Sequence, residues 1–220
     1  METKIVAEYK TVRGVSGGEY EEKRSRFLAV MIPVASVQEV SEQVAAVQKE
    51  HFSAKHHCFA YRLLDGQTRQ ADDGEPHGTG GKPILDLLCG EDLYNVLVIV
   101  TRYFGGVLLG TGGLSRAYGA AARAAWEAAE PVIMEYRAGF TMTLPYAGYE
   151  KMQAMLYRAG AVVESAEYTD SVCLRCSVPV ESAASFALTV KDFSAGTIVP
   201  KSTGFFYSQK KRSVENLRIL

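Results

Sequence analysis

The sequence predicts an α+β protein of two domains, and three observations support this fold class. Strand-like and helix-like segments follow one another along the whole chain of 220 residues, of which 47% are hydrophobic and 22% charged. Twelve of the 20 glycines fall between residues 66 and 119, so the first part of the chain differs in composition from the rest. After residue 130 the segments take the order β-α-β-β-α-β, which is a complete domain pattern by itself.

The first domain is predicted to open with two strands and a helix. The strands cover residues 3–13 and 25–34, and we expect them to be joined by a turn at Gly17 and Gly18. Ser36 and Glu39 have the spacing of a capping box, and valines recur beyond them at helical spacing. The next strand covers residues 56–64 and ends at Asp65-Gly66, after which residues 65–82 have no periodicity and are expected to form a long loop.

The remainder of this domain is predicted to be helix, strand and helix. Pro83 suits the first position of a helix that Gly90 would end. Residues 94–102 form the apolar run of a well-covered strand. Residues 113–129 read as a helix whose many alanines allow it to pack closely on a sheet, and Pro131 lies in the expected domain boundary at 130–136.

The second domain is predicted to be the split βαβ or ferredoxin-like unit. Its strands are expected at 137–146, 161–168, 171–180 and 196–200, and its helices at 148–160 and 181–193. The segment 208–220 is mixed in charge and is expected to be a weakly ordered tail.

Two glycine-rich loops, each of which leads into a predicted helix, are the strongest functional signal. They cover residues 71–83 and 102–116, and each contains a Gly-Thr-Gly-Gly element. Free N–H groups at a helix start, made accessible by glycine, form an anion site that suits phosphate. The predicted anion-binding residues are Gly78, Thr79, Gly80, Gly81, Lys82, Arg102, Gly105, Gly106, Gly110, Thr111, Gly112, Gly113, Ser115 and Arg116.

A plainer interpretation stays open: the glycines make tight turns and let the alanine-rich helix approach the sheet. The nucleotide-binding fingerprints are not matched, because Pro76 and Pro83 interrupt a P-loop pattern and Ser115 stands at the last position of a dinucleotide pattern. We therefore expect no cofactor.

Acidic and histidine side chains in and before the first loop are the candidates for chemistry. Asp72, Asp73, Glu75 and His56 could act as acid or base or hold a magnesium-like ion, although "DDGEP" is also ordinary turn chemistry. His56 and His57 open a strand and point to opposite faces, so only one of them can join a given site. No ligand spacing typical of a metal site is matched, and no metal is expected.

Composition narrows the class of protein. A net charge of −1 and a pI near 6.4 exclude a broad basic surface for nucleic acid but leave room for a local patch. No apolar run has the length of a membrane span, and the first residues do not form a signal peptide. Four cysteines are too few to staple a secreted scaffold of this size, so we expect a cytoplasmic protein with reduced thiols and no membrane contact.

The segments "DDGEPHGTGGKPIL", "RYFGGVLLGTGGLSRAY" and "AKHHCFAYRL" closely resemble the signatures of the IMPACT/YigZ family. The resemblance covers the chain to about residue 205. It implies an N-terminal domain at 1–132 like domain IV of elongation factor G, with the β-α-β fold of GHMP-type kinases, then a ferredoxin-like domain at 136–205 like domain V, and a tail at 206–220.

The resemblance also implies translational control through protein partners for eukaryotic relatives, and no settled activity for bacterial members. Three hypotheses follow. The first is a non-enzymatic factor in translation or the stress response that binds RNA, the ribosome or a translation-related protein. The second is an enzyme that acts on a phosphorylated small molecule or nucleotide, and the third is a protein-interaction module whose glycine loops are only architectural.

Overall fold

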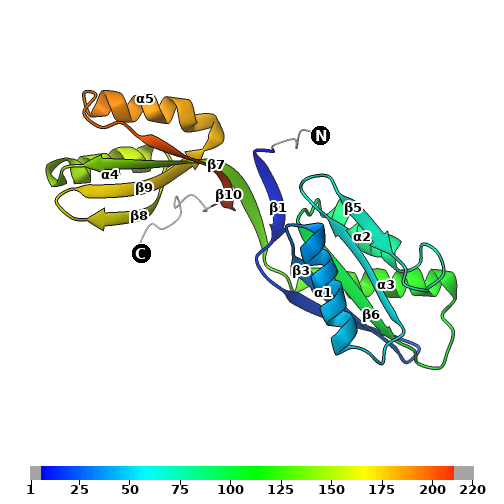
Figure 1. The fold of residues 1–220 in the computed structure, drawn as a ribbon. Helices are drawn as coiled ribbons and strands as arrows, with labels where there is room; N and C mark the ends of the chain where they lie inside the picture. Colours follow the sequence, from blue (N-terminus) through cyan, green and yellow to red (C-terminus); the bar gives the residue numbers. More distant parts are fainter. Residues whose placement is uncertain (1–5, 211–220) are drawn as a thin grey trace, which may run out of the picture. The chain divides into compact units, whose positions relative to one another are not determined.

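The structure is a computed structural model that describes residues 6–210 of the chain (Figure 1). Its internal contacts divide the chain into two compact units. The first contains Tyr9–Ile133, and the second contains residues 6–8 and 134–210. Strands β1 (Glu8–Val12) and β7 (Pro131–Leu144) pair with each other, and each continues from one unit into the other. The predicted boundary segment at 130–136 is therefore largely strand.

The first unit is built on a five-stranded sheet in which every neighbouring pair is antiparallel. The order across the sheet is β2 (Ser16–Glu22), β3 (Ser25–Pro33), β6 (Val96–Tyr103), β4 (His56–Arg62) and β5 (Thr68–Ala71). The predicted apolar strand is confirmed as β6, the middle strand, whose residues are buried up to Arg102. Its central place explains why it reads as a continuous apolar run.

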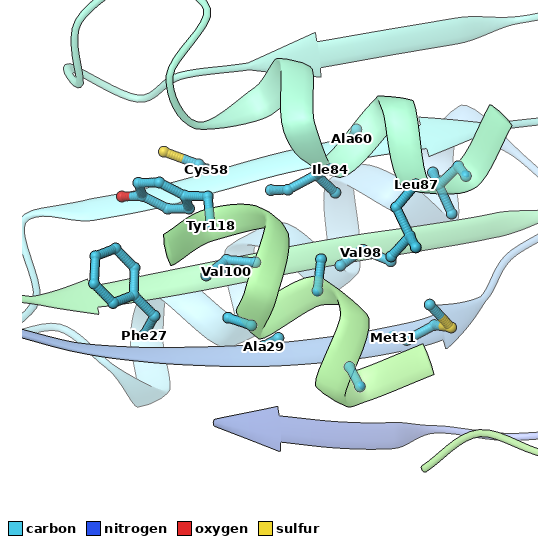
Figure 2. Close-up of a cluster of buried hydrophobic side chains, with 14 of the residues drawn as sticks. Phe27, Ala29, Met31, Cys58, Ala60, Ile84, Leu87, Val98, Val100 and Tyr118 are labelled. Carbon is cyan, nitrogen blue, oxygen red and sulfur yellow. The ribbon is translucent and has the colours of Figure 1, made fainter. Parts of the chain in front are cut away.

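Helices cover both faces of this sheet. Helix α1 (Val37–Glu50) lies on one face over a cluster that includes Val40, Tyr61 and Ile99. Helices α2 (Gly81–Gly90) and α3 (Gly110–Glu127) lie on the other face (Figure 1). Figure 2 shows the larger core there, in which side chains of α2 and α3 pack against the sheet.

The capping box of α1 is confirmed. The backbone N–H of Glu39 donates to Ser36 Oγ at 3.2 Å, while the Glu39 carboxylate accepts from the backbone N–H of Ala35 at 2.8 Å. Two backbone amides at the helix start thereby gain side-chain partners.

The predicted turn at Gly17 and Gly18 is wrong, because both glycines lie inside β2. The chain reverses instead at Lys23 and Arg24, which take left-handed φ angles of 47° and 66°. Gly18 has a packing role: a Cβ there would overlap the backbone of Ala125 in α3. In the sequence, a glycine that is needed for close packing of a helix on a strand therefore looks the same as a glycine that makes a turn.

Loop and helix limits also differ from the prediction in the glycine-rich region. The segment 65–82 is not all loop, since it contains the short polar edge strand β5, whose residues are exposed or half-buried and carry no apolar pattern. Helix α2 begins at Gly81, before Pro83, and α3 begins at Gly110 instead of residue 113. The second Gly-Thr-Gly-Gly element is consequently the first turn of α3 itself.

The second unit has the predicted ferredoxin-like arrangement. Its strands follow the order β10 (Lys201–Gln209), β7, β9 (Val172–Pro179) and β8 (Val162–Tyr168), all antiparallel. Helices α4 (Tyr146–Arg158) and α5 (Ala183–Phe193) bury one face of this sheet, with a short 3-10 turn before α5. Among residues 6–210, no helix is both long and apolar enough to cross a membrane.

The last strand lies later in the chain than predicted. Residues 196–200 are irregular, and β10 begins at Lys201 and extends to Gln209. Polar residues flank its three aromatic residues, Phe205, Phe206 and Tyr207, and a bulge lies between Ser202 and Gly204, so no regular alternation indicates the strand. The expected tail at 206–220 therefore begins inside a strand, and its residues 211–220 lie outside the described part of the chain.

Candidate phosphate-binding surface

The first glycine loop is closed by a carboxylate of the protein itself. Asp72 Oδ1 accepts from the backbone N–H groups of Gly80 at 3.0 Å and Gly81 at 2.8 Å, and Oδ2 accepts from that of Gly78 at 2.8 Å. Burial raises the pKa of Asp72, but the three backbone donors outweigh it and hold the pKa below its usual range. The predicted anion site at the start of α2 is thus already occupied by an anion.

The side chains of Thr79 and Lys82 in that loop are also engaged. Thr79 Oγ1 donates to the carbonyl of Pro76 at 2.7 Å, and Lys82 Nζ pairs with Asp86 one helical turn later at 2.8 Å. The residues predicted here are brought together, but they bind one another. This outcome corrects the expectation that the first loop offers free phosphate donors.

Glu75 and Arg102 form a buried ion pair behind the loop. Arg102 Nη1 lies 2.7 Å from Glu75 Oε1, and the Tyr118 hydroxyl donates to the same oxygen at 2.8 Å. The side chains of Glu75 and Arg102 are only 4% and 7% exposed. Arg102, predicted to bind an external anion, is instead neutralised by Glu75.

The surroundings of this pair are aromatic and apolar. Tyr118 meets Phe27 edge to face at 5.0 Å, and Figure 2 shows Tyr118 lying between Phe27 and Cys58. Burial raises the pKa of Tyr118, so its hydroxyl stays protonated and can donate to Glu75. Burial also raises the pKa of the Cys58 thiol to about 12. These groups pack and orient one another, and none has the lowered pKa of an activated nucleophile.

Asp73 holds the beginning of β4. Its carboxylate accepts from the backbone N–H of His57 at 2.7 Å, and its carbonyl oxygen lies 2.8 Å from His56 Nδ1. His57 is buried, and its Nε2 has no partner within residues 6–210. Each of the four candidates for catalysis therefore has a hydrogen-bond partner within the protein: Asp72, Asp73, Glu75 and His56. The described residues contain no group of three or more His, Cys, Asp or Glu placed to hold a metal.

The second glycine loop presents an open helix start. Gly110, Thr111 and Gly112 are exposed, and the first turn of α3 has neither a side-chain cap nor an acidic residue. The Arg116 guanidinium lies near Gly112, with Nη1 3.6 Å from the position of a Cβ on that glycine. The positive end of the helix dipole and a cation therefore lie together, where an anion would be favoured.

The hairpin turn between β2 and β3 borders this loop. This contact was not predicted from the sequence. The Gly105 N–H donates to Ser25 Oγ at 3.1 Å, and a Cβ on Gly105 would overlap the backbone of Arg24. Lys23 and Arg24 are exposed at this turn. The two adjacent basic residues were the only indication of this site in the sequence. The pairing of β3 with β6 is what brings them next to the second glycine loop.

The second glycine loop also carries exposed apolar side chains. Phe104 is 57% exposed and Leu108 83% exposed, and both lie between β6 and α3. The Arg102 guanidinium lies 5.5 Å from the centre of the Phe104 ring, within the range of a cation–π contact. We call residues 23–24, 104–113 and 116 the α3 surface.

Comparisons with known proteins agree with the two-part architecture. The family model described as "Impact N-terminal domain" matches residues 23–126, and "Domain of unknown function (DUF1949)" matches residues 142–197. "IMPACT family member YigZ" of Escherichia coli (strain K12) is 33% identical over 182 residues, which are 81% of this chain and 89% of that protein. An "IMPACT family member" of Haemophilus influenzae is 31% identical over 198 residues, 88% of this chain and 96% of that one.

A eukaryotic relative and a solved structure extend the comparison. "Protein IMPACT" of Rattus norvegicus is 37% identical over 101 residues, which are 43% of this chain and 31% of that protein. The structure titled "Crystal structure of an hypothetical protein" has a TM-score of 0.61 at 30% identity and covers 89% of this chain and 97% of its own.

Proposed function

Because the chain belongs to the IMPACT family, we propose that it is a non-enzymatic factor of translation or the stress response that binds RNA through the α3 surface. The translational setting comes from the family resemblance. The RNA-binding site comes from one observation: of the two matched glycine elements, α2 has its amides filled by Asp72, whereas α3 has an uncapped, exposed first turn beside Arg116.

The shape of the α3 surface supports a phosphate-bearing chain over a single free phosphate. Open amides and Arg116 would hold one phosphate, and Lys23 and Arg24 across Gly105 would hold a neighbouring one. The exposed ring of Phe104, in the same loop, offers a stacking face for an unpaired base. A local basic patch of this kind is compatible with a net charge of −1.

The engagement of the acidic candidates supports a binding role over an enzymatic one. Asp72 and Glu75 are committed to backbone amides and to Arg102, so neither offers a free carboxylate for proton transfer. The alternative of an enzyme acting on a phosphorylated small molecule would need one of these bonds to be released.

Fluorescence anisotropy with a labelled single-stranded RNA of about 12 nucleotides tests the proposal. Affinity should fall as salt rises from about 50 to about 200 mM, and Arg24→Ala or Arg116→Ala should each weaken binding about five- to tenfold and flatten the salt slope by about 0.7. Phe104→Ala should cost about tenfold through lost stacking. Arg175→Ala, exposed on β9, is the matched control and should bind as the unaltered protein does.

Free nucleotides and inorganic phosphate form the second arm of the test, read as a shift in Tm. RNA that binds more tightly than either supports the proposal. Equal affinity for a free nucleotide, with the same dependence on Arg116, would favour the small-molecule alternative instead. RNA binding that ignores all three substitutions would refute the assignment of the α3 surface.

A further inference from the structure

A groove between α1 and the edge of the first sheet is separate from the α3 surface. It has a volume of about 220 Å³, and its floor consists of Phe59 and Tyr61 of β4 and Arg69 of β5. Its wall is the side of α1 that carries Val37 and Val44. Both valines are only half-buried, so α1 leaves apolar surface uncovered beside the sheet edge.

Strand β5 has one free side. Within residues 6–210, it is the last strand in the sheet order and pairs only with β4. The Leu63 N–H donates to the carbonyl of Gln67 at 2.8 Å, which sets the alternation of the ladder: Arg69 turns its backbone groups toward β4, and Thr68 and Gln70 turn theirs away. Within residues 6–210, neither Thr68 nor Gln70 donates its outward N–H to another backbone group. An unpaired edge of this kind can accept an added strand.

We propose that this edge and groove bind an extended peptide, as a strand added to β5, in which an acidic residue and an apolar residue stand two positions apart. A residue opposite Arg69 would occupy a non-hydrogen-bonded pair, where facing side chains lie closest. All residues that line the groove belong to the described part of the chain, and among them Arg69 alone carries a charge. An acidic residue at that position would therefore be favoured.

The groove supplies the apolar half of the recognition. A residue two positions from the acid on the added strand points to the same face and reaches the valines of α1. The volume suits one large apolar side chain, since a cavity of about 150 Å³ accommodates a benzene molecule. The uncharged polar lining residues Ser41 and Gln48 add no competing charge.

Charge also argues against a second copy of the chain as the occupant. Two β5 strands paired antiparallel about a twofold axis would bring Arg69 near the Arg69 of the other copy. Like charges in such a pair are destabilising, so the same residue that favours an acidic peptide disfavours edge-to-edge dimers.

Titration of the ¹⁵N-labelled full chain with two synthetic peptides of about six residues tests the proposal. One peptide places a glutamate and a valine two positions apart among threonines, and the other has lysine in place of the glutamate. The glutamate peptide should shift the amide resonances of Thr68 and Gln70, and the lysine peptide should bind at least about tenfold more weakly. Arg69→Glu should reverse this preference. Arg175→Glu, exposed on β9, should leave it unchanged.

Gln70→Pro provides a second variant that keeps the fold. It removes one outward N–H without removing a bond to β4, so it should weaken the glutamate peptide about fivefold or more while resonances elsewhere persist. Three results would overturn the proposal: no shifts on β5 at millimolar peptide, equal binding of both peptides by the unaltered chain, or a dimer in sedimentation that Gln70→Pro dissociates.

Discussion

The buried pair of Glu75 and Arg102 gives the sharpest prediction of this structure. Glu75→Leu would leave the Arg102 guanidinium, 7% exposed, without its counter-charge. Removal of one partner of a buried ion pair costs about 3–5 kcal/mol, and loss of the hydrogen bond from Tyr118 would add about 1 kcal/mol. We expect the free energy of unfolding of the first unit to fall by about 4 kcal/mol or more.

The double variant Glu75→Leu/Arg102→Met separates pairing from packing. With both charges replaced by apolar side chains of similar length, the cost should shrink to within about 2 kcal/mol of the unaltered protein, giving a large coupling energy. Urea unfolding followed by the fluorescence of Trp126, the single tryptophan, reports on the first unit because this residue packs on its core. If Glu75→Leu cost less than about 1 kcal/mol, or if the double variant equalled the sum of the singles, the pairing argument would fail.

Three further predictions concern the same unit. Asp72→Asn should lower the free energy of unfolding at pH 7 by about 2 kcal/mol. Because the pKa of Asp72 is lower in the folded state, its contribution to stability is present above the unfolded pKa and is lost as pH falls through the folded pKa. Acid unfolding that is the same in the variant and the unaltered protein would contradict this role. Gly18→Ala should lower the free energy of unfolding in urea by about 3 kcal/mol. Gly17→Ala should change it little, because the nearest atom to the added Cβ lies at 3.8 Å. Equal effects of the two substitutions would refute the packing explanation. At pH 8, iodoacetamide should modify the exposed Cys89 and spare the buried Cys58. The pKa of Cys58, about 12, leaves about one thiolate in ten thousand at this pH. Comparable labelling of the two cysteines in mass spectrometry would be inconsistent with the burial of Cys58.

Elements with strong local signals could be predicted from the sequence. The capping box at Ser36 marks the start of α1, and the apolar run of β6 identifies a covered strand. Strands β5 and β10 were not predicted, because β5 is a short polar edge strand and β10 has a bulge and no regular alternation of apolar and polar residues. Such strands form because a neighbouring strand offers hydrogen bonds, and that information does not lie in their own residues.

The sequence by itself determined that a glycine-rich element lies at the start of each of two helices and that carboxylates and cations lie near these elements. Only the tertiary structure decided which amides are open. The Asp72 carboxylate accepts hydrogen bonds from the amides of the α2 loop, whereas no side chain of residues 6–210 caps the start of α3. The physical reason is that a hydrogen-bond donor has the same chemistry whether its acceptor is a carboxylate of the protein or a phosphate from outside. Which one reaches it depends on the path of the chain in space.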